Sequence, residues 1–236
     1  LLAPMSEVAG RLAVIEGASN LKANAGGRGI LISGVPGTAP AEVLVVGGGV
    51  VGVNAAKMAI GLGARVTVFD RSVPRLRYLS DIFGSSITAR YSNKVVLAEA
   101  IKSADMVIGA VLIPGAVAPK LISREQLSTM QPGAVLVDVA IDQGGCFETS
   151  LATTHDDPTY IVDGIVHYCV ANMPGSVPRT SSEALNNATL PHVLALADSG
   201  VAALNEDAHL ANGLNVSGGK IVYQAVLDAI REKPVN

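Results

Sequence analysis

Between residues 41 and 170 the chain alternates short β-branched runs with longer segments in which apolar residues recur at helical spacing. The short runs predict strands at 42–46, 65–69, 87–91, 106–109 and 135–139, with a further pair at 160–162 and 166–170. The longer segments predict helices at 50–62, 74–83, 94–102 and 123–130. Because such alternation builds a parallel sheet with helices on both faces, we expect an α/β fold with a doubly wound parallel sheet.

The two ends of the chain depart from this alternation. Residues 5–24 predict a long helix, and 29–33 predict a short strand that is closed by turn-forming residues at 35–38. After Pro178 the pattern changes to helix, loop and helix, and it ends in an amphipathic segment at 220–231.

This change of pattern predicts two domains. We expect a principal domain at residues 4–178 and a C-terminal helical segment at residues 179–236 that is the remnant of a second domain. The chain has no initiator methionine and begins inside a predicted helix, so we expect it to be part of a longer protein.

A glycine-rich turn follows the first strand of the main series. Gly47, Gly49 and Gly52 open the next predicted helix, and Asp70 ends the following strand 18 residues beyond Gly52. This is the spacing of a Rossmann dinucleotide site, in which the glycines bring the backbone close to a pyrophosphate and the acidic residue binds the ribose hydroxyls. A 2′-phosphate would be repelled by Asp70, so the pattern favours NAD over NADP, although Arg71 and Arg75 nearby act in the opposite sense. A glycine turn without a ligand is the alternative.

Two further segments place polar residues after strands. Asp142 lies just beyond the predicted strand 135–139, where ligands of open α/β sheets gather, whereas Asp138 lies within that strand. Asp142 is equally compatible with a turn before the two glycines that follow it. Asn172 lies in a loop that contains Pro174 and Pro178. Its side chain is compatible with a hydrogen bond to a nicotinamide or to a neighbouring carboxamide, and equally with a role in capping the loop.

Composition narrows the class of ligand. Hydrophobic residues make up 49% of the chain and charged residues 16%, which excludes a disordered protein. The formal net charge is −3 and basic residues are scattered, so we expect no nucleic acid and no anionic membrane among the partners. The most apolar stretch, 43–64, includes six glycines and is better explained by strand, loop and helix than by a membrane span. These observations favour a protein whose ligand or substrate is a small molecule.

Cysteine usage and the N-terminus indicate the compartment. Cys146 and Cys169 lie 23 residues apart, without the spacing of a metal site, and we expect two buried thiols in a reducing cytoplasm. No signal peptide is recognisable, so the expected localisation is cytoplasmic. Apolar residues at helical spacing in 5–24 exceed what a lone domain needs to bury, which predicts a homo-oligomer.

Several segments together resemble the L-alanine dehydrogenase family. The resemblance extends from residue 1 to about residue 215 and is carried by the glycine motif and by the segments 2–10, 108–111 with Pro114 and Gly115, 138–148 and 167–174. It implies an NAD-dependent oxidative deamination of L-alanine to pyruvate and ammonia, and a hexamer. It also implies that Asp142 is an active-site residue and that the NAD site is lined by Ser6, Asp70, Arg75, Ser92, Val111, Val170 and Asn172.

The resemblance also indicates what this sequence lacks. In that family an N-terminal substrate domain supplies a catalytic histidine and the Arg and Lys that bind the alanine carboxylate, and this chain begins after that region. None of the four histidines has a context that matches: His155, His167, His192 and His209. We therefore expect the chain itself to bind NAD but not to oxidise alanine. Two alternatives stay open: the nucleotide-binding subunit of a proton-translocating transhydrogenase, and a non-catalytic NAD-binding module.

Overall fold

The structure is a computed structural model that describes residues 1–111 and 118–231. Two compact units make up the chain, one formed by Leu2–Ser181 and the other by Leu1 and Ser182–Asn236. The first unit contains a large sheet with its helices, and the second is mainly helical. The assignment of residues 179–236 to a second domain of a longer protein stays a prediction.

A seven-stranded sheet forms the centre of the first unit, in the order β3-β2-β1-β4-β5-β7-β6. All neighbours pair in parallel except β6, which runs antiparallel to β7 at one edge. The strands are β1 (Glu42–Val46), β2 (Arg65–Asp70), β3 (Ile87–Tyr91), β4 (Met106–Gly109), β5 (Val135–Asp138), β6 (Thr159–Val162) and β7 (Ile165–Tyr168). The order reverses between β1 and β4, as in doubly wound folds, so the predicted fold class is confirmed.

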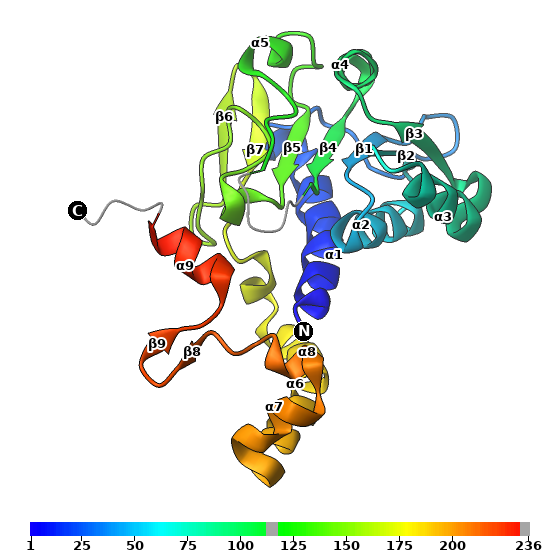
Figure 1. The fold of residues 1–236 in the computed structure, drawn as a ribbon. Helices are drawn as coiled ribbons and strands as arrows, with labels where there is room; N and C mark the ends of the chain where they lie inside the picture. The colour runs from blue at the N-terminus through cyan, green and yellow to red at the C-terminus, as the bar shows by residue number, and fades with distance from the viewer. Residues whose placement is uncertain (112–117, 232–236) are drawn as a thin grey trace. The chain divides into compact units, whose positions relative to one another are not determined.

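Helices cover both faces of this sheet (Figure 1). On one face lie α1 (Ala3–Asn20), α2 (Val50–Gly61) and α3 (Val73–Phe83), and on the other α4 (Lys94–Ala100) and α5 (Arg124–Leu127). Side chains of β1 alternate between them: Val43 and Val45 belong to the first apolar core, and Leu44 and Val46 belong to the second. The near-continuous apolar runs of the central strands thus follow from burial on two sides.

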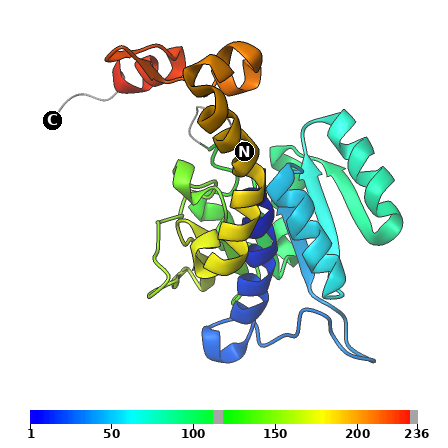
Figure 2. The ribbon, with the colours of Figure 1, turned by 90° about the horizontal axis from the view of Figure 1, so that it is seen from below.

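Helices α1 and α2 run side by side in close contact (Figure 2). A Cβ atom on Gly10 would lie 2.2 Å from the carbonyl oxygen of Val51, so no larger residue fits at this crossing. Arg11 Nε donates a hydrogen bond of 3.1 Å to Asn54 Oδ1 across the same interface. The crossing holds the first turns of α1 beside the beginning of α2, where the candidate site lies.

Asp105 joins the beginnings of two central strands. Its carboxylate is largely buried, accepts a hydrogen bond of 2.8 Å from the backbone N–H of Glu42, and forms an ion pair with Arg28. Since Asp105 immediately precedes β4 and Glu42 begins β1, this buried charge stabilises the amino end of the sheet, opposite to the carboxyl ends of the strands.

Several predicted elements differ from the structure. The prediction of a strand at 29–33 is wrong, and these residues form bends and turns. The N–H groups of Gly29 and Ile30 donate to the carbonyl oxygen of Leu21 and are therefore not available for pairing with a strand of the sheet. The first helix ends at Asn20 and not at residue 24, and the helix predicted at 123–130 spans only Arg124–Leu127. Short 3-10 segments are η1 (Ala23–Ala25), η2 (Gly84–Ser86), η3 (Ile101–Ser103), η4 (Ile141–Gln143), η5 (Met173–Ser176) and η6 (Gly200–Ala202).

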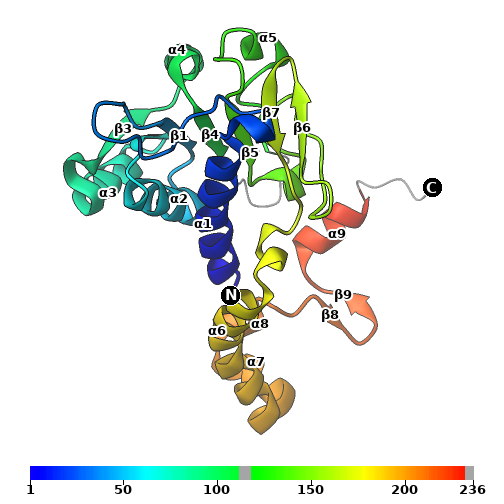
Figure 3. The same cartoon turned by 180° about the vertical axis from the view of Figure 1, so that it is seen from behind.

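The second unit is built from short helices and one small hairpin (Figure 3). Its elements after the long α6 (Pro178–Ser199) are α7 (Ala203–Glu206), α8 (Ala208–Ala211), β8 (Val216–Ser217), β9 (Lys220–Ile221) and α9 (Gln224–Arg231). The predicted amphipathic segment at 220–231 is therefore a strand followed by a helix. The two glycines between β8 and β9, Gly218 and Gly219, have positive φ angles and make the tight hairpin turn.

Gly52 and Gly61 lie on the same helix, α2, and provide a matched pair of substitutions. A Cβ on Gly52 would lie 1.8 Å from the carbonyl oxygen of Gly47, whereas a Cβ on Gly61 meets nothing within 4 Å. We expect Gly52→Ala to lower the free energy of unfolding by about 2 kcal/mol through overpacking. We expect Gly61→Ala to raise it by about 0.5 kcal/mol through helix propensity. Urea unfolding followed by circular dichroism measures both, and equal effects of the two variants would contradict the packing argument.

Candidate functional site

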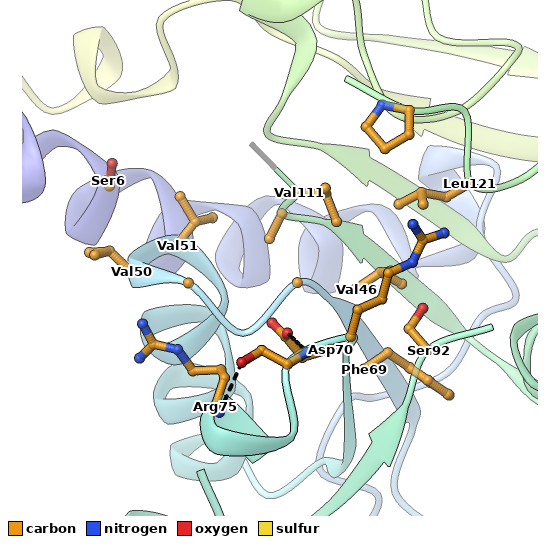
Figure 4. Close-up of a pocket in the computed structure, with 16 residues that line it drawn as sticks. Ser6, Val46, Val50, Val51, Phe69, Asp70, Arg75, Ser92, Val111 and Leu121 are labelled. Atoms are coloured by element: carbon orange, nitrogen blue, oxygen red, sulfur yellow. Dashed lines mark hydrogen bonds between the residues drawn. The ribbon is translucent and has the colours of Figure 1, made fainter. Parts of the chain in front are cut away.

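A pocket of about 610 Å³ opens at the carboxyl ends of the central strands (Figure 4). Its volume lies within the range of about 300–1,000 Å³ that is usual for small-molecule sites. It is lined by Ser6, Val46, Gly47, Gly49, Val50, Val51, Phe69, Asp70, Arg71, Ser72, Arg75, Ser92, Ala110, Val111, Pro119 and Leu121. Of the sequence-predicted cofactor residues, the pocket brings together Ser6, Gly47, Gly49, Asp70, Arg75, Ser92 and Val111.

The glycine turn forms the floor between β1 and α2. Gly47 has a φ of +106°, and a Cβ there would lie 2.6 Å from the carbonyl oxygen of Ala110, so the turn requires glycine. Gly49 is the N-cap of α2 and has no capping side chain, and the position of its missing Cβ is open for 4 Å. The positive end of the α2 dipole and its first N–H groups therefore face the pocket, which suits an anionic group.

Asp70 stands at the end of β2, beside the glycine turn. Its Oδ2 accepts a hydrogen bond of 2.8 Å from the N–H of Gly48, and its Oδ1 accepts one of 2.7 Å from the N–H of Ser72. These two bonds fix the carboxylate while leaving it half-buried at the pocket wall. Because each carboxylate oxygen has a further lone pair, Asp70 retains the capacity to accept hydrogen bonds from hydroxyl groups of a ligand.

Two arginines also line this end of the pocket. The guanidinium carbon of Arg75 lies 5.2 Å from the centre of the Tyr78 ring. The backbone N–H of Arg75 donates a hydrogen bond of 3.3 Å to Ser72 Oγ. Arg71 directly follows Asp70 and lines the same pocket. The positive charges offset part of the negative charge of Asp70, as the sequence suggests.

The remaining pocket residues come from separate elements. Ser6 lies on α1, Ser92 follows β3, and Val111 follows β4. The N–H of Ser92 donates a hydrogen bond of 2.9 Å to the carbonyl oxygen of Asp70, which ties the end of β3 to that of β2. Pro114 and Gly115 lie outside the described residues.

Gly52, Asp142, Val170 and Asn172 do not line this pocket. Gly52 packs behind the glycine turn, against Gly47. Val170 is fully buried after β7. Asn172 is exposed in the left-handed region with a φ of 52°, and its carbonyl oxygen accepts a hydrogen bond of 2.9 Å from the N–H of Gly175.

Asp142 is exposed within η4, in the loop that follows β5. That loop is bound to the segment 118–122: the N–H of Ala118 donates to the carbonyl oxygen of Gln143 at 3.2 Å, and the N–H of Leu121 donates to that of Cys146 at 2.7 Å. Because Leu121 lines the pocket, backbone hydrogen bonds connect the Asp142 loop to the pocket wall.

A buried polar cluster supports the far end of this loop. His167 is fully buried, its Nε2 lies 2.7 Å from Thr149 Oγ1, and its ring stacks on Tyr160 at 5.0 Å. Tyr160 Oη donates to the carbonyl oxygen of Thr149 at 2.8 Å and accepts from the N–H of Leu151 at 2.7 Å. Burial lowers the pKa of His167 and raises the pKa of Tyr160, so both rings are neutral at pH 7.

Both cysteines are free and buried. Burial is the largest cause that raises the pKa of Cys146, followed by the charge of Asp138, and burial raises the pKa of Cys169 to about 11. Neither thiol is therefore a reactive thiolate at neutral pH.

Among residues 1–111 and 118–231, no three His, Cys, Asp or Glu side chains are grouped as metal ligands would be. In the same residues, no helix combines the length and the apolar character that crossing a membrane requires.

Sequence reasoning missed several pocket residues and one structural role. Val46, Phe69 and Ala110 lie at or next to the ends of β1, β2 and β4, and they line the pocket only because these strands converge there. A pattern of single strands contains no such signal. Asp138 is fully buried and accepts several hydrogen bonds from the Asp142 loop. The signal for it was present: an aspartate at the end of the otherwise apolar run Val135–Asp138 needs donors nearby.

Comparison with known proteins gives a consistent match to one family. The family described as "Alanine dehydrogenase/PNT, C-terminal domain" matches residues 13–224. An alanine dehydrogenase of Halomonas elongata is 63% identical over 230 residues, which cover 97% of this chain and 62% of that protein. The chain therefore spans about 62% of the length of this curated relative.

Solved structures give the same match. A structure of an L-alanine dehydrogenase has a TM-score of 0.94 and 52% identity, covering 98% of this chain and 64% of that one. A transhydrogenase from Sinorhizobium meliloti has a TM-score of 0.73 and 27% identity, covering 95% of this chain and 61% of that one. This chain is thus more similar to the first of these proteins in both fold and sequence.

The buried His167 predicts a loss of stability in acid. Since burial lowers its pKa below the ordinary value of about 6.5, the unfolded chain binds a proton that the folded chain excludes, and stability is lost as pH falls below about 6.5. We expect His167→Gln to have a shallower decline of melting temperature between pH 7.5 and 5.5 than the unmodified chain. The exposed His155→Gln is the control and should keep the original slope. Identical slopes for all three proteins would contradict the assignment.

Proposed function

The chain belongs to the alanine dehydrogenase/PNT C-terminal domain family, and on this premise we propose that it is the NAD-binding part of an L-alanine dehydrogenase. The reaction proposed for the whole protein is the reversible oxidative deamination of L-alanine to pyruvate and ammonia. One observation carries the proposal: Asp70 and the open N-terminus of α2 face the same pocket. The 63% identity to the Halomonas elongata alanine dehydrogenase supports the choice of substrate.

The residues present fit a dinucleotide. The space left by the absent side chain of Gly49 would receive the pyrophosphate against the N-terminus of α2, and Asp70 would accept hydrogen bonds from the ribose hydroxyls. Bound NAD supplies the hydride-accepting chemistry, which no side chain provides. Ser6, Ser92 and Val111 would enclose the cofactor from three further elements.

NAD is proposed in preference to NADP because of charge. A 2′-phosphate would stand next to the carboxylate of Asp70, whose two oxygens are already fixed by the N–H groups of Gly48 and Ser72. The carboxylate therefore cannot turn away without losing both bonds. Arg71 and Arg75 reduce this repulsion without removing its cause, the fixed negative charge.

On the substrate side, Asp142 is the proposed catalytic residue. It is exposed after the end of β5, where ligands of open α/β sheets bind, and a carboxylate there can accept a proton from the amino group or from the attacking water. Val170 and Asn172 follow β7, the next strand in the sheet, and are proposed to border the nicotinamide end.

A second function draws on the structural similarity to the Sinorhizobium meliloti transhydrogenase. In that case the chain would bind a nicotinamide dinucleotide and exchange hydride with a second one, without an amino acid. The lower identity, 27% against 52% for the alanine dehydrogenase structure, makes it the weaker proposal. Assembly with copies of this chain, with a hexamer as the expected form, stays a prediction.

Cofactor choice is the first test of this proposal. We expect NAD to bind at least tenfold more tightly than NADP, which corresponds to about 1.4 kcal/mol, and we expect Asp70→Ala and Asp70→Asn both to narrow the ratio. Asn removes the charge and keeps one of the two hydrogen bonds to the turn, whereas Ala removes the charge and both bonds, so comparing the two variants distinguishes charge repulsion from loss of the turn. The exposed Asp81→Asn on α3 is the control. Titration calorimetry with both cofactors measures the four proteins, and equal affinities in the unmodified chain would refute the preference.

Alanine turnover is the second test. We expect the whole protein that the gene encodes to reduce NAD with L-alanine, and Asp142→Asn to lower kcat by about 10²-fold or more through loss of proton transfer. Residues 1–236 alone should bind NAD without oxidising alanine, because the family resemblance assigns the cations that bind the alanine carboxylate to a region outside this sequence.

The absorbance of NADH measures alanine oxidation both by the whole protein and by residues 1–236. The exposed Asp156→Asn should leave kcat unchanged. Turnover by residues 1–236 at the rate of the whole protein would disprove the assignment of the missing groups.

A further inference from the structure

Asp138 is a fully buried carboxylate at the end of β5. Its Oδ1 accepts a hydrogen bond of 3.0 Å from the N–H of Ala140, and its Oδ2 accepts bonds of 2.7 and 3.3 Å from the N–H groups of Cys146 and Phe147. Ser150 Oγ also donates to Oδ2, and Cys146 Sγ lies 3.4 Å from Oδ1. All of these donors belong to the loop that follows the strand.

These bonds close the loop into a ring. Ala140 and Cys146 lie on the two sides of Asp142, so a single carboxylate holds both ends of the segment that carries the proposed catalytic residue. Gly145 makes the closure possible, because a Cβ there would lie 2.8 Å from Asp138 Oδ2 and its φ is +72°. Both ends of the segment are thus bound to the last residue of β5.

The ring is also fixed from outside. Lys120 Nζ donates bonds of 2.6 and 2.8 Å to the carbonyl oxygens of Gly144 and Gly145. Residues on either side of Lys120, Pro119 and Leu121, line the dinucleotide pocket. The position of Asp142 is thereby tied to the wall of that pocket.

We propose that Asp138 is a positioning residue, which holds the Asp142 loop in register with the dinucleotide pocket through its ring of loop donors. The proposal rests on the proposed function of Asp142. A carboxylate is required, because it only accepts hydrogen bonds and meets donors on both oxygens. An asparagine would direct its NH₂ group at N–H donors on one side and release that end of the loop. A misplacement of about 1 Å can cost about 10² in rate.

The test compares Asp138→Asn with Asp105→Asn in the whole protein. Asp105 is the matched control, since it is also a buried carboxylate that accepts a backbone N–H, but at the amino end of the sheet. We expect Asp138→Asn to lower kcat for alanine oxidation by about 10²-fold while KM for NAD changes less than about threefold. We expect Asp105→Asn to keep kcat within about twofold of the value for the unsubstituted protein, even if the substitution lowers the melting temperature.

Hydrogen exchange gives a readout that does not depend on turnover. With NAD bound, amides of residues 140–147 should exchange at least tenfold faster in Asp138→Asn than in Asp105→Asn, while amides far from both substituted residues exchange alike. Ser150→Ala, which removes one donor, should show a smaller change of the same kind and serves if Asp138→Asn does not fold.

The positioning role is overturned if amides 140–147 exchange at the same rate in Asp138→Asn, or in Ser150→Ala, as in the Asp105→Asn control. It is also overturned if Asp138→Asn and Asp105→Asn have the same kcat. A wild-type protein without alanine turnover refutes the proposed function instead, and loop exchange then tests the positioning role by itself.

Discussion

The backbone of α2 lies against the turn after β1 so closely that no side chain fits between them. A Cβ on Gly52 would stand 1.8 Å from the carbonyl oxygen of Gly47, and this contact sets the angle at which the helix leaves the sheet. Because α2 begins directly at the end of β1, its N-terminus faces the carboxyl ends of the strands. Gly47 and Gly52 permit the packing, and Gly49 between them leaves that N-terminus uncovered, so both features depend on one short segment.

Other elements reach the pocket through this contact. Gly10 lets α1 cross α2 at the distance of backbone contact. The crossing brings Ser6, which lies 41 residues before Gly47 in the sequence, to the pocket. On the other side, the parallel register of β2 with β1 places Asp70 where it accepts the N–H of Gly48. Ser6 and Asp70 are thus placed by helix crossing and by strand register, respectively.

The extent to which sequence predicts this site depends on how local each constraint is. Gly47, Gly49 and Asp70 belong to one βαβ unit, so their spacing alone predicts their convergence. Ser6, Ser92 and Val111 come from three other elements, and only the resemblance to a known family indicated them. The strand expected at 29–33 failed for a related reason: its N–H groups bond to Leu21 in the preceding segment, a partner that an apolar pattern does not reveal.

The two buried carboxylates, Asp105 and Asp138, lie at opposite ends of the sheet and have different kinds of hydrogen-bond partner. Asp105 pairs with Arg28 and accepts the N–H of Glu42, so its charge is compensated at the amino end of the sheet. The described hydrogen-bond donors to Asp138 all belong to the loop after β5. A buried charge costs free energy unless it is fully hydrogen-bonded. A loop that satisfies such a charge with its own backbone is therefore confined to one conformation, and this is the property that a carboxylate acting on a bound substrate requires.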